Sequence, residues 1–377
     1  MKKYFCRSFA VMALGTALLT ACVEDNNNSG TMVVAMTDGV YVLGSGNMYA
    51  GIDGNLTYYD FDSKTATTCA FQAANGKSLG KTPNDVLQYG SKLYIAVDGE
   101  NTVFVLDGKT LKQVAALSTT EMMGEEDGIS PRRLTGSQGI IYVSTYGGYV
   151  AAIDTLNFTL KNKYKAGSYP EGIFVMGDYL FVANSDYGMG QNPSISRILL
   201  STGVDDPLTN ENIRNPQSLA VTTTGDIYFL DYGSYGPAPD YEQTNAGVYC
   251  VSGSQVRRVI PDATAMGCAG NMIYAFSALY GKDVKYFSYN VTTGHMEQFS
   301  PEGIESPAAI EVDPVTGIVF IASYHTTTSD YGTFADYSAP AYVNVYGSTL
   351  SAPTATFACG VGPARIAFCH SSKTVNY

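Results

Sequence analysis

Residues 227–231 read IYFLD, an apolar residue and an aromatic residue followed by two further apolar residues. A closely related pattern recurs at intervals of about 40 to 55 residues, the length of a repeat that forms one four-stranded blade of a β-propeller. Its seven occurrences are VYVLG (40–44), LYIAV (93–97), IYVST (141–145), LFVAN (180–184), IYFLD (227–231), IYAFS (273–277) and VFIAS (319–323). Each occurrence predicts a short buried strand, because aromatic and β-branched residues are favoured in strands.

Another strand, which starts at a proline, precedes most of these patterns. It begins at Pro83, Pro131, Pro170, Pro216 and Pro307, and in a degenerate form (ATAMGCAG) at Ala263. The last such strand, PARIAFC from Pro363, has no repeat after it, whereas the pattern at Val40 has no such strand before it. We therefore predict an all-β fold, a single seven-bladed β-propeller of four-stranded blades, in which the C-terminal strand pairs with the N-terminal strands and closes the ring. A solenoid of stacked repeats is the alternative, although it would leave both ends open.

The N-terminus, MKKYFCRSFAVMALGTALLTAC, has a basic start followed by an apolar stretch from Phe9 to Leu19 that is too short to span a bilayer. This pattern is typical of a signal peptide. Residues 19–22, LTAC, match the lipobox at which bacterial lipoproteins are cleaved and acylated on the new N-terminal cysteine. We predict a signal peptide over residues 1–21, lipidation at Cys22, a polar tether over 22–36 and the propeller over 37–377. Ordinary secretion without a lipid is the alternative.

The tether favours a particular location. Glu24 and Asp25 follow Cys22 directly, in a pattern that resembles the acidic export signal for surface lipoproteins of one Gram-negative lineage. We therefore expect a protein held in the outer membrane by its N-terminal lipid alone and exposed at the cell surface.

Charge and cysteine content exclude some classes of function. The chain carries a formal net charge of −12, so it would repel nucleic acid. An odd number of cysteines remains after residue 22, which argues against a complete disulfide framework and leaves their pairing open. None has the spacing of a zinc ligand, so no metal site is predicted. These cysteines are Cys69, Cys250, Cys268, Cys359 and Cys369.

The connections after the repeated strands are long and rich in tyrosine. Asp-Tyr-Gly occurs at 186–188, 231–233 and 330–332, and related triplets follow the strands at 141–145 and 273–277. One interpretation is structural, with Asp capping the turn, Gly adopting a positive φ and Tyr packing between blades. The other is a binding face, because tyrosine offers a large amphipathic contact area with few rotamers to lose.

Polar residues at the starts of the proline-led strands are expected on the same face, near the central channel. They either solvate the channel mouth or contact a ligand, and their mixed charge suits a neutral, amide-rich ligand. Asp85, Arg133 and Arg365 belong to this group. The predicted ligand-binding residues are Tyr146, Tyr187, Tyr232, Tyr235, Tyr280, Tyr331, Asn47, Asn84, Arg132, Glu171 and Gln217.

Catalytic patterns are weak. The chain has only three histidines and no recognisable Ser/His/Asp arrangement, and LTGSQG (134–139) lacks the G-x-S-x-G elbow. We predict a protein that is not an enzyme, although propeller hydrolases and lyases exist and this fold is compatible with both.

Four segments carry a resemblance to a known family: GVYVLGSGNMYAGIDGNLTYYDFDSKTAT (39–67), TPNDVLQYGSKLYIAVDGENTVFVLDGKTLK (82–112), IIYVSTYGGYVAAIDT (140–155) and GSYPEGIFVMGDYLFVANSDYG (167–188). Together they resemble the YncE-like surface propeller lipoproteins and, within them, the BtuG-type cobalamin-binding lipoproteins.

The resemblance implies that the protein captures cobalamin (vitamin B12) on its loop-rich face and passes it to a TonB-dependent outer-membrane transporter. Cobalamin would be a bound ligand and not a catalytic cofactor. The alternatives are a surface adhesin or a glycan- or protein-binding propeller, and a propeller hydrolase or lyase.

Overall fold

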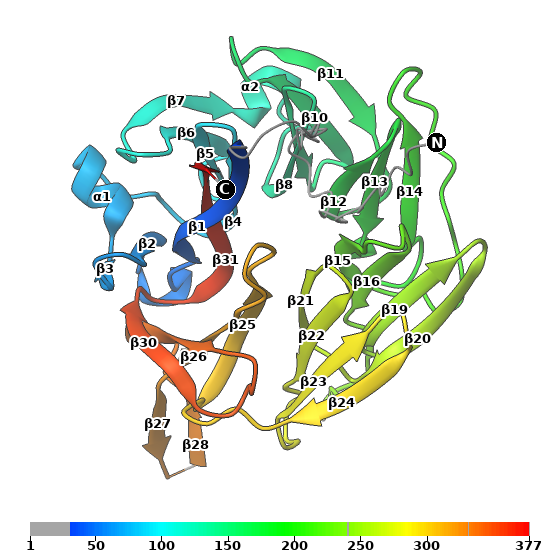
Figure 1. Ribbon diagram of the computed structural model, residues 1–377. Coiled ribbons are helices and arrows are strands. Elements are labelled where there is room, and N and C mark those ends of the chain that lie inside the picture. The colour runs from blue at the N-terminus through cyan, green and yellow to red at the C-terminus, as the bar shows by residue number, and fades with distance from the viewer. Residues whose placement is uncertain (1–30, 240, 331, 377) are drawn as a thin grey trace, which may run out of the picture.

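The computed structural model describes residues 31–239, 241–330 and 332–376. The predicted signal peptide, Cys22 and the first part of the tether lie outside the described residues, as does Tyr331. The described residues form an all-β structure in which sheets are disposed around a common centre (Figure 1). Short helical turns are few: η1 (Met48–Ala50), α1 (Ala70–Asn75), α2 (Thr119–Met123) and η2 (Asp186–Gly188). In the described parts of the chain, none of the helices has the length and hydropathy needed to cross a bilayer.

Within the described residues there are seven larger sheets, each with its inner strand nearest the centre. From the inner strand outward, the first three sheets contain β31 (Pro363–Asn376), β1 (Thr31–Gly44), β2 (Asn55–Asp60) and β3 (Thr65–Thr67); β4 (Pro83–Tyr89), β5 (Lys92–Val97), β6 (Thr102–Asp107) and β7 (Gln113–Ser118); and β8 (Pro131–Ser137), β9 (Ile140–Thr145), β10 (Tyr149–Asp154) and β11 (Leu160–Lys165).

The remaining larger sheets follow in chain order. They contain β12 (Pro170–Met176), β13 (Tyr179–Asn184) and β14 (Ser194–Leu199); β15 (Pro216–Val221), β16 (Ile227–Asp231), β19 (Gly247–Ser252) and β20 (Gln255–Pro261); β21 (Ala265–Ala269), β22 (Met272–Ser277), β23 (Lys285–Asn290) and β24 (His295–Phe299); and β25 (Ser306–Val312), β26 (Val319–Tyr324), β29 (Ala341–Tyr346) and β30 (Pro353–Cys359). Two small hairpins, β17 (Ser234–Tyr235) with β18 (Gln243–Thr244) and β27 (Thr326–Ser329) with β28 (Gly332–Ala335), extend from connections.

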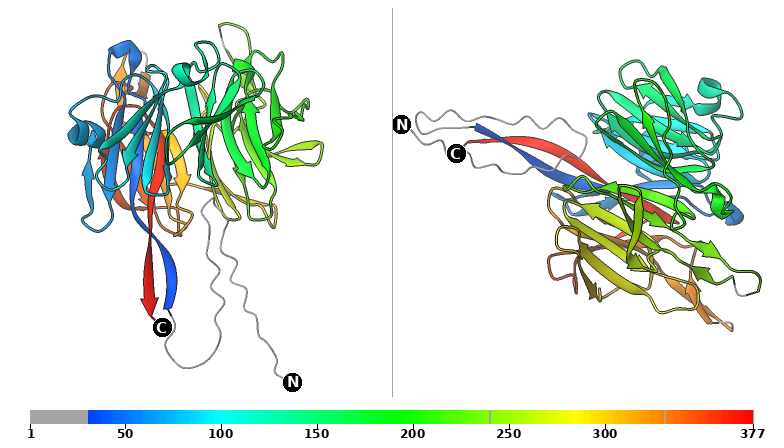
Figure 2. Two further views of the ribbon diagram at one scale, coloured as in Figure 1. Left: turned by 90° about the horizontal axis from the view of Figure 1, so that it is seen from above. Right: turned by 90° about the vertical axis from the view of Figure 1, so that its right-hand side faces the viewer.

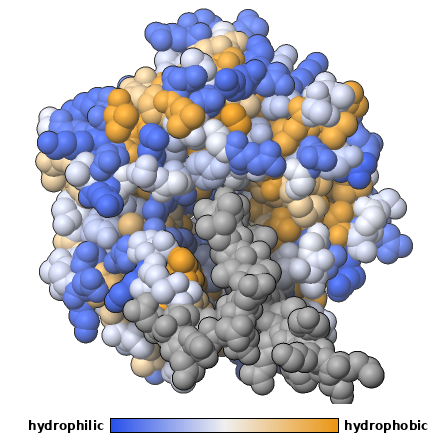
Figure 3. All heavy atoms as spheres, turned by 45° about the horizontal axis from the view of Figure 1, so that its top comes forward, coloured by the Kyte–Doolittle hydropathy of each residue, from blue (hydrophilic) through white to orange (hydrophobic). Residues whose placement is uncertain are grey.

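The hydrophobic core is divided among the spaces between neighbouring sheets. The described residues form seven buried clusters, and each joins two sheets. One cluster, for example, brings Val42 of β1 against Phe320 of β26, and another brings Leu43 of β1 against Ile95 of β5. The sheet that contains β1 therefore packs on the next sheet along the chain and also on the last one. On the side seen in Figure 3, hydrophobic residues form separate groups among hydrophilic ones.

The first and last described strands form one long antiparallel pair. β1 pairs with β31 from Thr31 opposite Asn376 to Gly44 opposite Pro363, but pairs with β2 only from Gly39 onward. Residues 31–38 and 370–376 therefore form a two-stranded extension, which we call the terminal ribbon, and it projects from the body of the molecule (Figure 2). β1 already begins inside the segment predicted as tether (22–36), because the backbone groups of residues 31–36 find hydrogen-bond partners on β31.

The base of the terminal ribbon is held by one buried carboxylate. Asp313, in the turn between β25 and β26, accepts a hydrogen bond from Thr37 Oγ1 at 2.7 Å, and its other oxygen lies 3.2 Å from His370 Nε2. These contacts link both strands of the ribbon to the body of the molecule.

One sheet departs from the predicted four-stranded form. β12, β13 and β14 form a sheet of three strands, and the segment after β14 touches it only through isolated bridges from Ile195 to Leu208 and from Ile198 to Asp205. Pro207 lies between these bridges and has no N–H to donate, so a regular fourth strand does not form there.

Candidate functional site

One side of the molecule carries the connections between the second and third strands of the sheets together with the starts of the inner strands, because successive strands run antiparallel. We call this side the loop face. β1 reaches it at Gly44, so the terminal ribbon, at the other end of β1, projects from the opposite side (Figure 2).

Exposed aromatic side chains concentrate on the loop face. Among the described residues, seven of the eight exposed aromatic residues lie in connections between second and third strands; the eighth, Tyr179, starts β13 on the opposite side. We call these seven the aromatic rim: Tyr49, Tyr187, Tyr235, Tyr241, Tyr280, Phe334 and Tyr337. Exposed rings that concentrate on one side of a protein make that side a candidate for contact with a ligand or a partner.

The predicted tyrosines divide into exposed and packed residues. Tyr187, Tyr235 and Tyr280 are exposed, and Tyr280 is 97% exposed. Tyr232 instead packs against the core cluster between the β15–β20 and β21–β24 sheets, and burial raises its pKa. Tyr146 is also half-buried. The packing interpretation therefore describes the surroundings of Tyr146 and Tyr232, whereas Tyr187, Tyr235 and Tyr280 are available to a ligand.

Tyr187 belongs to a group of three rings. Its ring centroid lies 6.0 Å from that of Tyr146 and 5.1 Å from that of Tyr169, and the Tyr146 and Tyr169 centroids are 5.1 Å apart. Tyr169 was not among the residues predicted from the sequence, although its position immediately before Pro170 places it at the start of an inner strand. The group presents Tyr187 to solvent and keeps Tyr146 beneath it.

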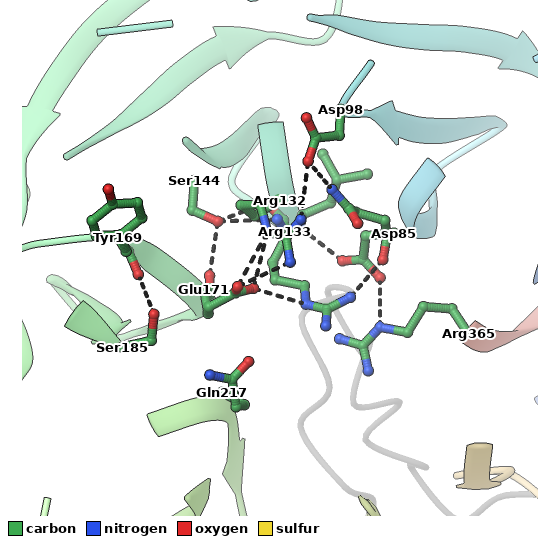
Figure 4. Close-up of polar contacts among 12 residues, drawn as sticks. Asp85, Asp98, Arg132, Arg133, Ser144, Tyr169, Glu171, Ser185, Gln217 and Arg365 are labelled. Carbon is green, nitrogen blue, oxygen red and sulfur yellow. Dashed lines mark hydrogen bonds and ion pairs between the residues drawn. The ribbon is translucent and has the colours of Figure 1, made fainter. Parts of the chain in front are cut away.

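A charged network lies below these rings at the starts of the inner strands (Figure 4). Glu171 is 1% exposed and accepts hydrogen bonds from Arg132 Nη2 at 2.9 Å and from Tyr146 Oη at 2.5 Å. Arg132 also donates to Asp98 Oδ2 at 3.2 Å, and its guanidinium lies 4.3 Å from the centre of the Tyr146 ring. Burial and the negative charge of Glu171 raise the pKa of Tyr146, so the phenol stays protonated and donates. The network thus joins three predicted residues, Arg132, Glu171 and Tyr146.

A second part of the network lies around Arg133. Its Nη1 donates to the Asn84 carbonyl oxygen at 2.5 Å, and the Asn84 side chain donates to the Pro131 carbonyl oxygen at 3.1 Å. Burial and the nearby guanidinium of Arg365 lower the pKa of Arg133 to about 10. Arg365 is paired in turn with Asp85, with 3.2 Å between Nε and Oδ1. Most charges at the starts of these inner strands are therefore paired with one another.

Two predicted residues serve local structure. Asn47 caps η1 through its side-chain oxygen and donates to the Tyr337 carbonyl oxygen at 3.1 Å, which ties two connections of the loop face together. Gln217 donates to Asn215 Oδ1 at 2.5 Å and does not bond to the Arg132–Glu171 network.

Two aspartates of the Asp-Tyr-Gly triplets, Asp186 and Asp231, accept hydrogen bonds from backbone amides. Asp186 Oδ2 accepts from the amides of Gln191 and Asn192 at 2.7 and 3.0 Å. Asp231 is fully buried and accepts from the amides of Arg214, Asn215 and Gly233. Its pKa is raised by burial. Both aspartates therefore fix the shape of the connections.

Other groups that could support chemistry are dispersed. Among the described residues no three His, Cys, Asp or Glu side chains come together as a metal site, and the five described cysteines are free. Glu311, which was not among the residues predicted from the sequence, lies on the inner strand β25, and burial raises its pKa to about 7. The loop face therefore presents exposed aromatic rings, hydroxyl groups and amides, and the charged side chains beneath them are paired with one another.

Comparisons with known proteins agree with the architecture. A family model described as "Domain of unknown function (DUF5074)" matches residues 38–202. No curated protein matches the chain significantly.

Solved structures similar to this chain include a "putative 6-phosphogluconolactonase from Bacteroides uniformis ATCC 8492", with a TM-score of 0.57 and 13% identity over 89% of this chain and 100% of that chain. The Myceliophteria thermophila Cps50 (Swd1) β-propeller domain has a TM-score of 0.51 and 12% identity over 78% of this chain and 96% of that chain. At such identities the similarity concerns the fold alone, which is propeller-like.

Proposed function

We propose that this chain is a lipid-anchored, seven-bladed propeller that captures a small ligand at the cell surface on its loop face. The observation that carries the proposal is the aromatic rim: seven of the eight exposed aromatic residues in the described parts of the chain gather on one side. A structural role would bury these rings, whereas a binding role leaves them accessible until the ligand covers them.

The seven-bladed, closed ring is part of the same proposal. It is supported by the seven core clusters, which link each large sheet to its neighbours, and by the pairing of β31 with β1, which joins the two ends of the chain in one sheet. Such pairing leaves no unpaired inner strand at the junction.

The ligand that we propose is cobalamin, on the strength of the family resemblance described above. A corrin is broad, nearly flat and fringed with amides, so it requires a wide surface with exposed rings and neutral hydrogen-bond partners. The loop face has exposed tyrosines, and the ion pairs Arg132–Glu171 and Arg365–Asp85 leave little unbalanced charge near its centre. Delivery to a TonB-dependent outer-membrane transporter would follow capture.

The proposed anchor is compatible with an accessible loop face. Cys22 precedes the terminal ribbon in the chain, and the ribbon projects from the side opposite the aromatic rim. A lipid at Cys22 would therefore leave the loop face directed away from the acyl chains. Fractionation of cells that express Cys22→Ala tests the anchor, because the variant is expected to leave the membrane fraction; a variant that remained there would contradict the anchor.

Calorimetry with cyanocobalamin tests the ligand, with the otherwise intact chain made lipid-free by Cys22→Ala. Tyr187→Ala and Tyr280→Ala are expected to weaken binding about 5- to 150-fold at the better-placed position, with little change in melting temperature, because both side chains are exposed. Tyr179→Ala is the matched control, since it removes an exposed tyrosine from the opposite side.

The outcomes separate the alternatives. If the parent does not bind cyanocobalamin, the corrinoid assignment is wrong and an adhesin or glycan-binding role takes its place. If the parent binds but Tyr179→Ala weakens binding as much as Tyr187→Ala and Tyr280→Ala, the loop face is not the site. Turnover of a lactone or glycan by the purified chain would replace capture with the hydrolase or lyase alternative.

A further inference from the structure

A second feature of the loop face is an open pocket of about 820 Å³. It lies between the three-stranded sheet β12–β14 and the sheet that contains β15, β16, β19 and β20. Hydroxyl, amide and charged side chains provide most of its polar lining, and Pro193, Pro207 and Ile213 provide apolar surface. No aromatic side chain lines it. The polar lining side chains used below are Gln191, Asn192, Asp205, Thr209, Glu211 and Arg214.

The pocket exists because one regular element is missing. The segment after β14 forms only two isolated bridges with its sheet, so residues 205–214 run as an irregular outer wall instead of a fourth strand. Asn212 Nδ2 holds this wall to the β19–β20 sheet by donating to the Val256 carbonyl oxygen at 3.0 Å. The facing wall, residues 190–194, is ordered by Asp186, which accepts from the amides of Gln191 and Asn192.

Arg214 is the distinctive residue of the pocket. Asp231 accepts a hydrogen bond from its backbone amide at 2.9 Å, which fixes its position. The charge of the guanidinium opposes the rise in the pKa of Asp231, but among the described residues no hydrogen bond or close ion pair of this guanidinium is formed. Its Nη1 atom is buried without a partner. An arginine in this situation gains more from an added carboxylate than one that is already paired, because bidentate, charge-assisted hydrogen bonds are the strongest that a guanidinium makes.

The rest of the lining favours hydroxyl groups on the ligand. Within the described chain, the side chains of Gln191, Asn192 and Thr209 have no hydrogen-bond partner, so they are free to bind one. The Glu211 side chain is exposed, and Asp205 is occupied by Ser196 Oγ at 2.7 Å and by the Arg197 amide at 2.9 Å. A lining with two acids and one arginine disfavours a polyanion such as a nucleotide, and the absence of a ring disfavours base stacking.

We infer that this pocket binds an acidic saccharide, with the sugar carboxylate on Arg214 and the sugar hydroxyls on the amide and hydroxyl side chains of the two walls. The inference is independent of the proposed corrinoid function, because it rests on a different set of residues. The volume of about 820 Å³ accommodates a short oligosaccharide.

Saturation-transfer NMR and calorimetry with the lipid-free chain test the inference. The acidic probes each carry one carboxylate, namely 3′-sialyllactose, 6′-sialyllactose and an oligosaccharide with a single terminal glucuronate, and the neutral probe is galactotriose. We expect at least one acidic probe to bind about tenfold or more tightly than the neutral one, and Arg214→Gln to remove that preference. Arg197→Gln is the matched control, because Arg197 is an exposed arginine of the neighbouring β14 that is paired with Asp206 and does not line the pocket.

A second variant distinguishes an effect on binding from an effect on folding. Gln191→Glu changes an exposed side chain without partners, so the fold should be kept, and the added negative charge should weaken the acidic probe while leaving the neutral one unchanged. Failure of all three acidic probes to bind would overturn the inference. So would binding that neither Arg214→Gln nor Gln191→Glu alters.

Discussion

Glu171 and Glu311 are two carboxyl groups of inner strands, the first buried and the second partly buried, with different electrostatic surroundings. Glu171 receives hydrogen bonds from Arg132 and from Tyr146, so its negative charge is compensated where it is buried. Glu311 forms no ion pair among the described residues, and backbone amides hydrogen-bond to its carboxyl group, including that of Val312 at 3.1 Å from Oε1 and that of Cys268. Burial therefore raises the pKa of Glu311 to about 7, with Arg365 opposing the shift.

The raised pKa of Glu311 predicts a pH-dependent stability. Between its ordinary pKa of 4.5 and about 7, the folded state keeps a proton that the unfolded state has lost, so the free energy of unfolding falls as the pH rises through this range. Glu311→Gln removes this effect. We expect the variant to gain about 1 to 3 kcal/mol relative to the parent between pH 5 and pH 8, measured by urea denaturation.

Glu297→Gln on β24 serves as a control for Glu311→Gln, since the Glu297 side chain is exposed. Its stability relative to the parent should be the same at both pH values. An equal difference at pH 5 and pH 8 for Glu311→Gln would contradict the shifted pKa.

At the scale of elements, the strands were the most predictable part of the molecule. Each of the seven repeated patterns lies in a strand, from β1 to β26, because the apolar pattern and the turn residues around it are encoded locally. The proline-led strands are also present, including the degenerate one, which forms β21 from Ala265. The terminal ribbon was not predictable in this way, because residues 31–36 pair with residues more than 300 positions away.

The candidate site was less predictable than the strands. The Asp-Tyr-Gly triplet occurs at both positions, but Tyr187 is exposed whereas Tyr232 packs on the core. Whether the tyrosine ring is exposed depends on the neighbouring sheet and not on the triplet. The unpaired guanidinium of Arg214 had no sequence signal of its own. A sequence signal does mark the irregular outer wall of the pocket, because STGVDDPLTNENIRNP (201–216) lacks the alternating pattern of a fourth strand.

The connection between β16 and β19 provides a test of the triplet. Gly233 has a φ of +67°, and a Cβ added there would lie 1.9 Å from the Thr244 carbonyl oxygen. Gly233→Ala is therefore expected to destabilise the protein by about 1 to 3 kcal/mol, from strain and displacement of the β17–β18 hairpin, as measured by denaturant unfolding.

Gly281→Ala is the matched comparison for Gly233→Ala. Gly281 has a nearly identical φ of +70° in the related Leu-Tyr-Gly triplet, but a Cβ there meets no atom within 4 Å. The loss of stability in Gly281→Ala should therefore come from the unfavourable φ alone and amount to about 1 kcal/mol. Equal losses in the two variants would show that the contact with Thr244 is unimportant.

At the scale of the whole molecule, the proposed ring closure rests on β31. Phe368 and Ile366 of this strand belong to the core cluster that joins the first and last sheets. Removal of the chain from Pro363 onward should therefore abolish cooperative unfolding, measured by calorimetry, because the first sheet would lose its inner strand.

A shorter truncation distinguishes the contribution of ring closure to stability from that of the terminal ribbon. Ending the chain at Ser371 removes most of the ribbon's second strand but keeps the segment of β31 that contacts the core, so cooperative unfolding should persist. Cooperative melting of the longer deletion at the parent temperature would mean that β31 does not close the ring.

The terminal ribbon also determines how the protein can be handled. Thr31 lies opposite Asn376, so both ends of the described chain leave the molecule side by side, on the side away from the aromatic rim (Figure 2). An affinity tag or a fluorescent protein joined to the C-terminus is therefore held on the side where we propose the lipid anchor. A sensor surface that captures such a tag presents the loop face to the flowing sample in the orientation that we propose for the cell, whereas random coupling through lysines would not.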